Sequence, residues 1–197
     1  MEVVPRIDRL LAVAVFAALA LGLSAAPAPG LRLPDLDNRL IDPFETATDT
    51  RAIVFLFISV DCPISNRYAP EIRRLSEKFA PRGVVFRLVY PNPSESPEAI
   101  RAHLKDYRYP GSAMRDSRQQ LARFTKATIT PEAALYDRQG RRLYLGRIDD
   151  RYVNLGVERP APTRHDLEEA LDDTLAGRAV RQSTAPAVGC FIADFAQ

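Results

Sequence analysis

Cys62 is the residue of this sequence best placed for nucleophilic chemistry. It follows an apolar run, Ile53 to Ile58, typical of a buried strand, and it precedes Asn66 to Phe79, where apolar residues recur at helical spacing. We therefore expect an exposed sulfur at a helix N-terminus, where backbone N–H groups and the helix dipole stabilise a thiolate. Because thiolates attack disulfides and peroxides, this position predicts redox chemistry rather than a buried, inert cysteine.

Cys190 is the second of two cysteines and lies in a tail behind the last expected helix. The tail can return to Cys62, so Cys190 can resolve an oxidised Cys62. A fixed disulfide that pins the tail is an equal alternative, and an intermolecular contact is a third. The sequence alone leaves these three roles open.

Two hydroxyl groups flank the candidate nucleophile. Ser59 lies three residues before Cys62 and Ser65 three residues after it. Both are expected to stabilise the Cys62 thiolate by hydrogen bonds. Asp61 has the opposite effect, because its negative charge disfavours a thiolate next to it and argues against a very low pKa.

The N-terminus predicts export. Arg6 and Arg9 precede an apolar run, Leu10 to Leu23, and small residues follow it. This pattern is typical of a signal peptide over residues 1–28, and the apolar run over residues 10–28 is nearly long enough to stay as an inner-membrane anchor. A periplasmic or otherwise exported protein keeps its disulfides, so export adds weight to both cysteines.

The remaining elements divide the chain into a domain over residues 29–178 and a tail over residues 179–197. Strands, helices and one hairpin are expected in this order: strand 51–60, helix 66–79, strand 84–90, helices 96–107 and 118–124, hairpin 133–148, helix 164–175. The early strand–helix–strand unit requires a parallel pair, and the hairpin adds antiparallel strands. The sequence thus predicts an α/β fold with a mixed central sheet flanked by helices.

This order, with Cys62-Pro63 at the first strand–helix junction, resembles the thioredoxin-like superfamily. Its redoxin branch, which includes AhpC/TSA-type peroxiredoxin-like and exported thiol–disulfide proteins, fits best. The resemblance covers roughly residues 31–175 and also rests on Ala69-Pro70-Glu71, on Thr130-Pro131 before a strand, and on the turn at 137–140.

The resemblance implies a thioredoxin-like fold and a substrate surface shaped by Pro63, Thr130 and Pro131. It implies a cis peptide bond before Pro131 that lies against Cys62. Thr130 would then offer its backbone to an extended peptide of a partner protein.

The sequence departs from both relatives that it resembles. Ser65 stands where thioredoxin has its second cysteine, and Phe55 stands where peroxiredoxins have a proline, although Ser59 fits their hydroxyl position. Pro131 lies near the position of their downstream arginine. These departures favour thiol–disulfide chemistry over peroxide reduction. Three arginines elsewhere in the sequence remain candidates for the role of that arginine: Arg118, Arg123 and Arg147.

The sequence thus predicts an exported thiol-dependent oxidoreductase that uses Cys62 on a protein disulfide, a thiol partner or a peroxide. No cofactor is expected, and the two histidines, His103 and His165, stand apart and predict no metal site. A net charge of +2 with dispersed Lys and Arg argues against nucleic acid. Two alternatives remain: a Sco-like copper chaperone that binds Cu(I) through Cys62 and Cys190, and a redox-inactive binding module.

Overall fold

The computed structural model describes residues 30–193 of the 197 residues. The predicted signal peptide or anchor, residues 1–28, lies outside this range. Among residues 30–193, no helix is both long enough and apolar enough to cross a membrane.

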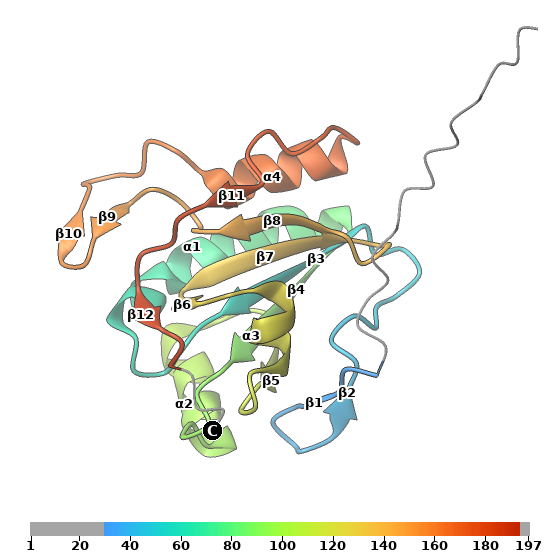
Figure 1. The fold of residues 1–197 in the computed structure, drawn as a ribbon, viewed down its shortest axis with the longest axis vertical. Coiled ribbons are helices and arrows are strands. Elements are labelled where there is room, and N and C mark those ends of the chain that lie inside the picture. Colours follow the sequence, from blue (N-terminus) through green and yellow to red (C-terminus); the bar gives the residue numbers. More distant parts are fainter. Residues whose placement is uncertain (1–29, 194–197) are drawn as a thin grey trace, which may run out of the picture.

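A six-stranded mixed sheet forms the centre of the protein (Figure 1). Neighbouring strands β3, β4 and β5 run parallel, whereas β7 is antiparallel to both β3 and β8, and β11 runs parallel to β8. Across the sheet the strands follow the order β11 (Thr184–Ala185), β8 (Arg142–Gly146), β7 (Glu132–Asp137), β3 (Ala52–Phe57), β4 (Val84–Tyr90) and β5 (Ser112–Arg115). The predicted parallel pair and the predicted hairpin are both confirmed.

Helices and short strand pairs surround this sheet. The helices are α1 (Pro63–Phe79), α2 (Pro97–Tyr107), α3 (Gln120–Thr125) and α4 (Asp166–Leu175), with a 3-10 turn at Ala80–Arg82. Three two-stranded antiparallel pairs are β1 (Leu33–Pro34) with β2 (Leu40–Ile41), β9 (Tyr152–Asn154) with β10 (Val157–Glu158), and β6 (Ile129–Thr130) with β12 (Cys190–Phe191). The predicted α/β fold is confirmed.

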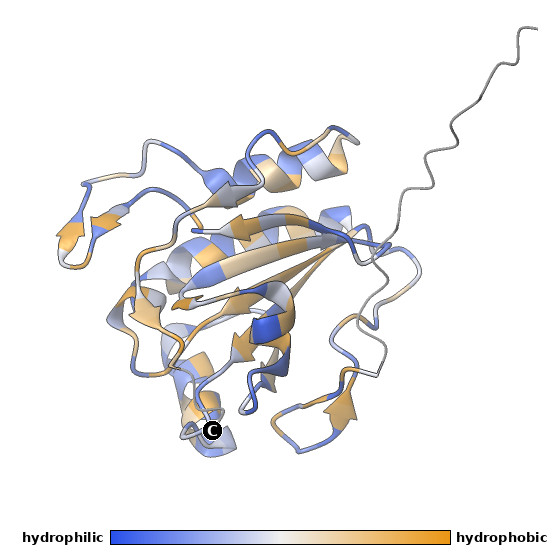
Figure 2. Cartoon of the chain, viewed as in Figure 1, coloured by the Kyte–Doolittle hydropathy of each residue, from blue (hydrophilic) through white to orange (hydrophobic). Residues whose placement is uncertain are grey.

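Strand β3 is buried on both faces, which explains its continuous apolar sequence. Since side chains alternate along a strand, Val54 and Leu56 share one core with the apolar faces of α1 and α4, whereas Phe55 and Phe57 pack in a second core that includes residues of α3. Figure 2 shows the apolar colouring of the central strands. The carboxyl end of β3, held between two cores, leads directly into Cys62.

Helix α1 begins three residues earlier than predicted. Pro63 occupies its first turn, and Cys62 is the N-cap residue with extended φ and ψ of −86° and 108°. A proline fits this first turn, because the backbone N–H that it lacks would have no partner inside the helix. The apolar spacing that predicted the helix is confirmed, since Ile72, Leu75 and Phe79 are all buried.

The tail after α4 is part of the fold rather than an appendage. Strand β11 extends the central sheet by pairing with β8, and β12 pairs with β6 beside the site (Figure 1). The approach of β11 is close: a Cβ atom at Gly146 would lie 2.1 Å from the Ala185 carbonyl oxygen. Such two-residue strands carry no periodic pattern, so the sequence predicted only a loop here.

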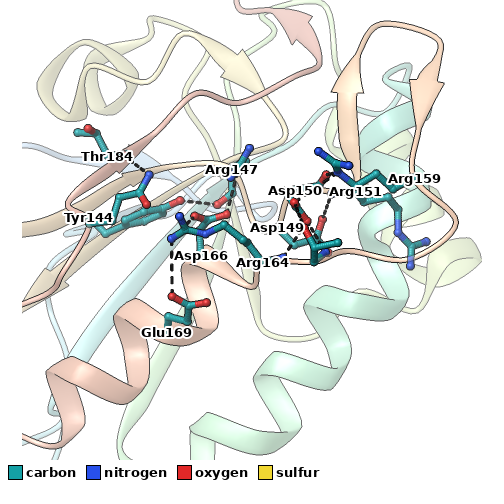
Figure 3. A network of polar contacts seen from close by, with 12 residues as sticks. Tyr144, Arg147, Asp149, Asp150, Arg151, Arg159, Arg164, Asp166, Glu169 and Thr184 are labelled. Atoms are coloured by element: carbon teal, nitrogen blue, oxygen red, sulfur yellow. Dashed lines mark hydrogen bonds and ion pairs between the residues drawn. The ribbon is translucent and has the colours of Figure 1, made fainter.

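Polar contacts tie the end of β8 to the start of α4 (Figure 3). Arg147 Nε donates to Asp166 Oδ2 at 2.7 Å, and Tyr144 Oη donates to the Arg147 carbonyl at 2.6 Å. Nearby, Asp150 Oδ1 accepts from the backbone N–H groups of Thr163 and Arg164 at 2.6 and 2.9 Å. These contacts fix the connection that carries the β9–β10 hairpin.

We expect Asp166→Ala to lower the free energy of unfolding by about 2 kcal/mol, because it removes a charged partner from Arg147 in a site where the Asp166 side chain is only 1% exposed. Glu169→Ala is the control: Glu169 is 42% exposed and lies 3.8 Å from Arg164, so its loss should change stability by less than about 0.5 kcal/mol. Urea denaturation measures both. Equal midpoints for the two variants would show that the Asp166 ion pair adds no stability.

Candidate active site

Cys62 lies where the end of β3 passes into α1, against the loop before β7. Its Sγ donates to the Thr130 carbonyl oxygen at 3.0 Å. The Thr130–Pro131 peptide bond is cis, as the resemblance implied, and that expectation is confirmed. The structure therefore brings the Cys62–Pro63 pair next to the Thr130–Pro131 pair, although about 70 positions separate the two pairs in the sequence.

The expectation of an exposed Cys62 sulfur is wrong, because Cys62 is only 1% exposed. The tail covers it. Strand β12 pairs antiparallel with β6, which places Cys190 opposite Thr130. Thr130 Oγ1 donates to the Cys190 carbonyl at 3.3 Å, and Ile192 N donates to the Thr128 carbonyl at 2.9 Å.

The two thiols influence each other and have opposite pKa shifts. Burial opposes ionisation of Cys62, but hydrogen bonds from Cys190 and Ser65 outweigh it, so the pKa of Cys62 is lowered. The pKa of Cys190 is raised to about 12, first by burial and then by Cys62 itself. Cys62 is thus the sulfur that ionises, and Cys190 is the neutral donor beside it.

The two serines that the sequence singled out lie in different surroundings. The Ser65 hydroxyl is fully buried and has no hydrogen-bond partner, so it is available to a Cys62 thiolate. The Ser59 hydroxyl instead donates to Glu95 Oε1 at 2.7 Å, which differs from the expected hydrogen bond to Cys62. Only Ser65 is in place to stabilise the thiolate directly.

Sequence reasoning missed Glu95, which holds the backbone just before Cys62. The same Oε1 that accepts from Ser59 also accepts from Val60 N at 2.7 Å, and Oε2 is buried without a partner. Burial raises the pKa of this carboxyl group. Glu95 belongs to a proline-rich segment that was expected to be a loop, and its burial leaves no mark in the local sequence.

A second missed group lies under the first turn of α1. Asn66 Nδ2 donates to the Val60 carbonyl at 3.2 Å, and Asn66 Oδ1 lies 2.6 Å from His103 Nε2. The other ring nitrogen, His103 Nδ1, lies 2.9 Å from Tyr90 Oη, and burial lowers the pKa of the imidazole. Asn66 therefore ties the loop to α2 rather than capping α1, and both nitrogens of His103 are engaged away from the cysteines.

One cluster outside this site has the ligand types of a metal centre. The ligand atoms of Glu71, His165 and Glu168 lie within 4.8 Å of one another. However, Arg74 pairs with both carboxylates, and Lys78 donates to Glu168 at 2.6 Å. These two cations already neutralise the acidic pair, so the cluster is an ion-pair network between α1 and α4.

A cavity of about 210 Å³ reaches the Cys62 sulfur between the β3–α1 junction and the tail. No lysine or arginine lines it, so the arginines considered as peroxide-activating groups, Arg118, Arg123 and Arg147, do not contribute. The lining residues are Ser59, Asp61, Cys62, Pro91, Asn92, Gln119, Thr130 and Cys190–Ala193. The site thus combines a low-pKa thiol, a second thiol and a small, partly apolar access path.

Solved structures of other proteins resemble this chain over most of its length. No family model matches the sequence, and no curated protein matches it. An uncharacterised conserved protein from Geobacillus kaustophilus is similar in structure, with 28% identity, a TM-score of 0.73, and coverage of 84% of this chain and 89% of that chain. A hypothetical protein from Sinorhizobium meliloti 1021 has 29% identity and a TM-score of 0.72, covering 87% of this chain and 94% of that chain.

A third solved structure has a described class. It is a putative thiol:disulfide interchange protein DsbE from Chlorobium tepidum, with 18% identity and a TM-score of 0.54, covering 77% of this chain and 94% of that chain. At this identity the likeness concerns the fold, and the AhpC/TSA subtype stays a prediction. The central sheet and helices of this chain, together with this likeness, show that the chain has a thioredoxin-like fold.

Proposed function

We propose that this protein is a thiol-dependent oxidoreductase in which Cys62 is the nucleophile and Cys190 resolves the oxidised form. The observation that carries the proposal is the pairing of β12 with β6, which places Cys190 opposite Thr130, the residue whose carbonyl accepts from Cys62 Sγ. Export through residues 1–28 remains part of the proposal. The similar fold of the putative thiol:disulfide interchange protein from Chlorobium tepidum supports the same class of chemistry.

The cycle begins with the Cys62 thiolate. It attacks one sulfur of a disulfide, the S–S bond breaks, and the released thiolate carries the electron pair away and takes up a proton. Cys190 then attacks the Cys62 sulfur of the mixed disulfide, loses its proton, and releases the second thiol. The substrate disulfide is reduced to two thiols, and the protein is oxidised to a 62–190 disulfide.

The opposite pKa shifts suit this division of roles. At neutral pH a lowered pKa gives Cys62 a larger thiolate fraction, whereas Cys190, with a pKa of about 12, stays protonated until Cys62 is consumed. Once Cys62 carries an S–S bond, its negative charge is gone, and that contribution to the high pKa of Cys190 disappears. The second step is therefore favoured only after the first.

The proposal predicts an intramolecular disulfide. Reduced protein treated with one equivalent of cystamine should lose two hydrogens in mass, and peptide mapping should find Cys62 joined to Cys190. The Cys190→Ser variant should instead retain one cysteamine unit, disulfide-bonded to Cys62, while the other cysteamine leaves as a free thiol. Wild-type protein that retains cysteamine on Cys62 would remove Cys190 from the cycle, and protein that does not react would remove Cys62 as the nucleophile.

The structure offers one observation in favour of copper binding and two against it. The two sulfurs lie side by side, as a soft Cu(I) site requires. Yet the high pKa of Cys190 opposes a second thiolate, and both ring nitrogens of His103 are engaged by Asn66 and Tyr90. The contacts of the pair therefore favour redox exchange over metal transfer.

A further inference from the structure

The C-terminal tail lies on the protein in the manner of a bound peptide. Residues Cys190 and Phe191 form an extended segment antiparallel to β6, and one further backbone hydrogen bond joins Ile192 to Thr128. Side chains alternate along this segment: Cys190 points to Cys62, whereas Phe191 is 80% exposed. Figure 1 shows β12 beside β6, far from α4, which ends only 15 residues earlier (190 − 175 = 15).

This position occupies the backbone of β6 beside Cys62, which a partner protein would otherwise pair with. A disulfide on a protein reaches a nucleophile most readily when its flanking residues add to a sheet edge as a strand. Here the backbone of Thr130 is already engaged by Cys190, and its carbonyl also accepts from Cys62 Sγ. With Cys62 1% exposed, what remains is the cavity of about 210 Å³, which admits a small molecule and no strand.

We propose that the tail is a built-in occupant of the peptide-binding edge, so that Cys62 of the resting protein reacts with a small disulfide or hydroperoxide and meets a protein disulfide only after the tail leaves β6. This inference rests on the proposed function, because it assumes that Cys62 is the nucleophile. With a disulfide, an S–S bond is exchanged as described above. With a hydroperoxide, the thiolate attacks an oxygen, the O–O bond breaks, and the leaving oxygen takes the electron pair and a proton, leaving a sulfenic acid on Cys62.

Gly189 is the residue that allows the tail to lie so close. A Cβ atom at this position would lie 2.0 Å from the Thr130 carbonyl oxygen, which is backbone and cannot turn aside. Any side chain at residue 189 must therefore push the tail away from β6. This gives a single substitution that opens the edge and alters neither Cys62 nor Ser65.

The test uses Cys190→Ser protein, in which the first adduct on Cys62 accumulates. Rates of adduct formation with cystamine, hydrogen peroxide and insulin are followed by mass spectrometry, with and without Gly189→Val. Because a displaced tail also takes the residue-190 donor away from Cys62, the insulin rate is compared with the cystamine rate of the same protein. We expect the ratio of the insulin rate to the cystamine rate to rise at least tenfold with Gly189→Val. Thr184→Val is the matched control, since Thr184 is an exposed tail residue away from β6.

A chain that ends at Pro186 provides a second way to open the edge, and it keeps β11. It should show the same gain in this ratio. A ratio that stays the same after both changes would overturn the inference while keeping Cys62 as the nucleophile. Absence of an adduct with every oxidant in every variant would instead overturn the proposed function. Reaction with only one of the two small oxidants would identify which electrophile the cavity admits.

Discussion

Replacing Cys62 with serine should lower the rate of disulfide reduction on the order of a thousandfold or more, because no other sulfur of the described chain has a lowered pKa. A serine hydroxyl is not ionised at neutral pH and does not form the mixed disulfide. Turnover of cystamine with an excess of a reducing thiol measures the loss. The variant should fold normally, since the exchange replaces one buried atom with a smaller one.

Cys190→Ser is the matched control for this measurement. It also removes one sulfur of the same pair, but it leaves the nucleophile, so the first chemical step should survive while turnover slows. Equal activity of wild type and Cys62→Ser would show that redox catalysis does not use this site. Equal loss in both variants at the first step would show that the two sulfurs act only as a unit.

Removal of the Cys190 side chain beyond its β-carbon should raise the pKa of Cys62 by about one unit. The hydrogen bond from Cys190 lowers that pKa, and a hydrogen bond to a charged group contributes about 1.5 to 3 kcal/mol, where 1.4 kcal/mol corresponds to one pKa unit. In Cys190→Ala, reaction of Cys62 with iodoacetamide should therefore rise at higher pH than in Cys190→Ser, which keeps a donor. At a pH below the pKa of Cys62 in both variants, the thiolate fraction should be about tenfold smaller in Cys190→Ala.

This comparison distinguishes the effect of a hydrogen-bond donor at residue 190 from the effect of the tail that covers Cys62. Both variants hold a single cysteine and both keep the rest of the tail, so their accessible paths to Cys62 are similar. A difference in the midpoint of the pH profile reports the hydrogen bond, whereas a difference in the plateau rate reports access. Identical midpoints would mean that the side chain at residue 190 does not contribute to the shift.

The fold was predictable where one segment contains its own pattern. The run at 53–58 is apolar throughout because both faces of β3 are buried, and the spacing of Ile72, Leu75 and Phe79 marks the buried face of α1. Strand β5 escaped prediction because it has four residues and only Ala113 and Met114 are buried. Strand β12 could not be predicted because it pairs with β6, which lies 60 positions away in the sequence.

The same distinction applies to the site. Cys62 and Pro131 were predictable because residue type and position relative to a strand sufficed. The burial of Cys62 was not, since it is imposed by Cys190 from the far end of the chain. Glu95 was likewise invisible: nothing in a proline-rich segment indicates that one of its carboxylates will accept from Ser59 and Val60.

The close approach of β11 to Gly146 carries a consequence for solubility. An outer strand with unpaired amides recruits strands of other molecules, and proteins commonly guard against this by covering it. The residues that lead to Cys190 supply that cover for β8. Detachment of the tail as far back as Thr184 would therefore expose β8 as an unpaired edge strand. The segment that positions the second thiol thus also protects the protein against aggregation through this edge.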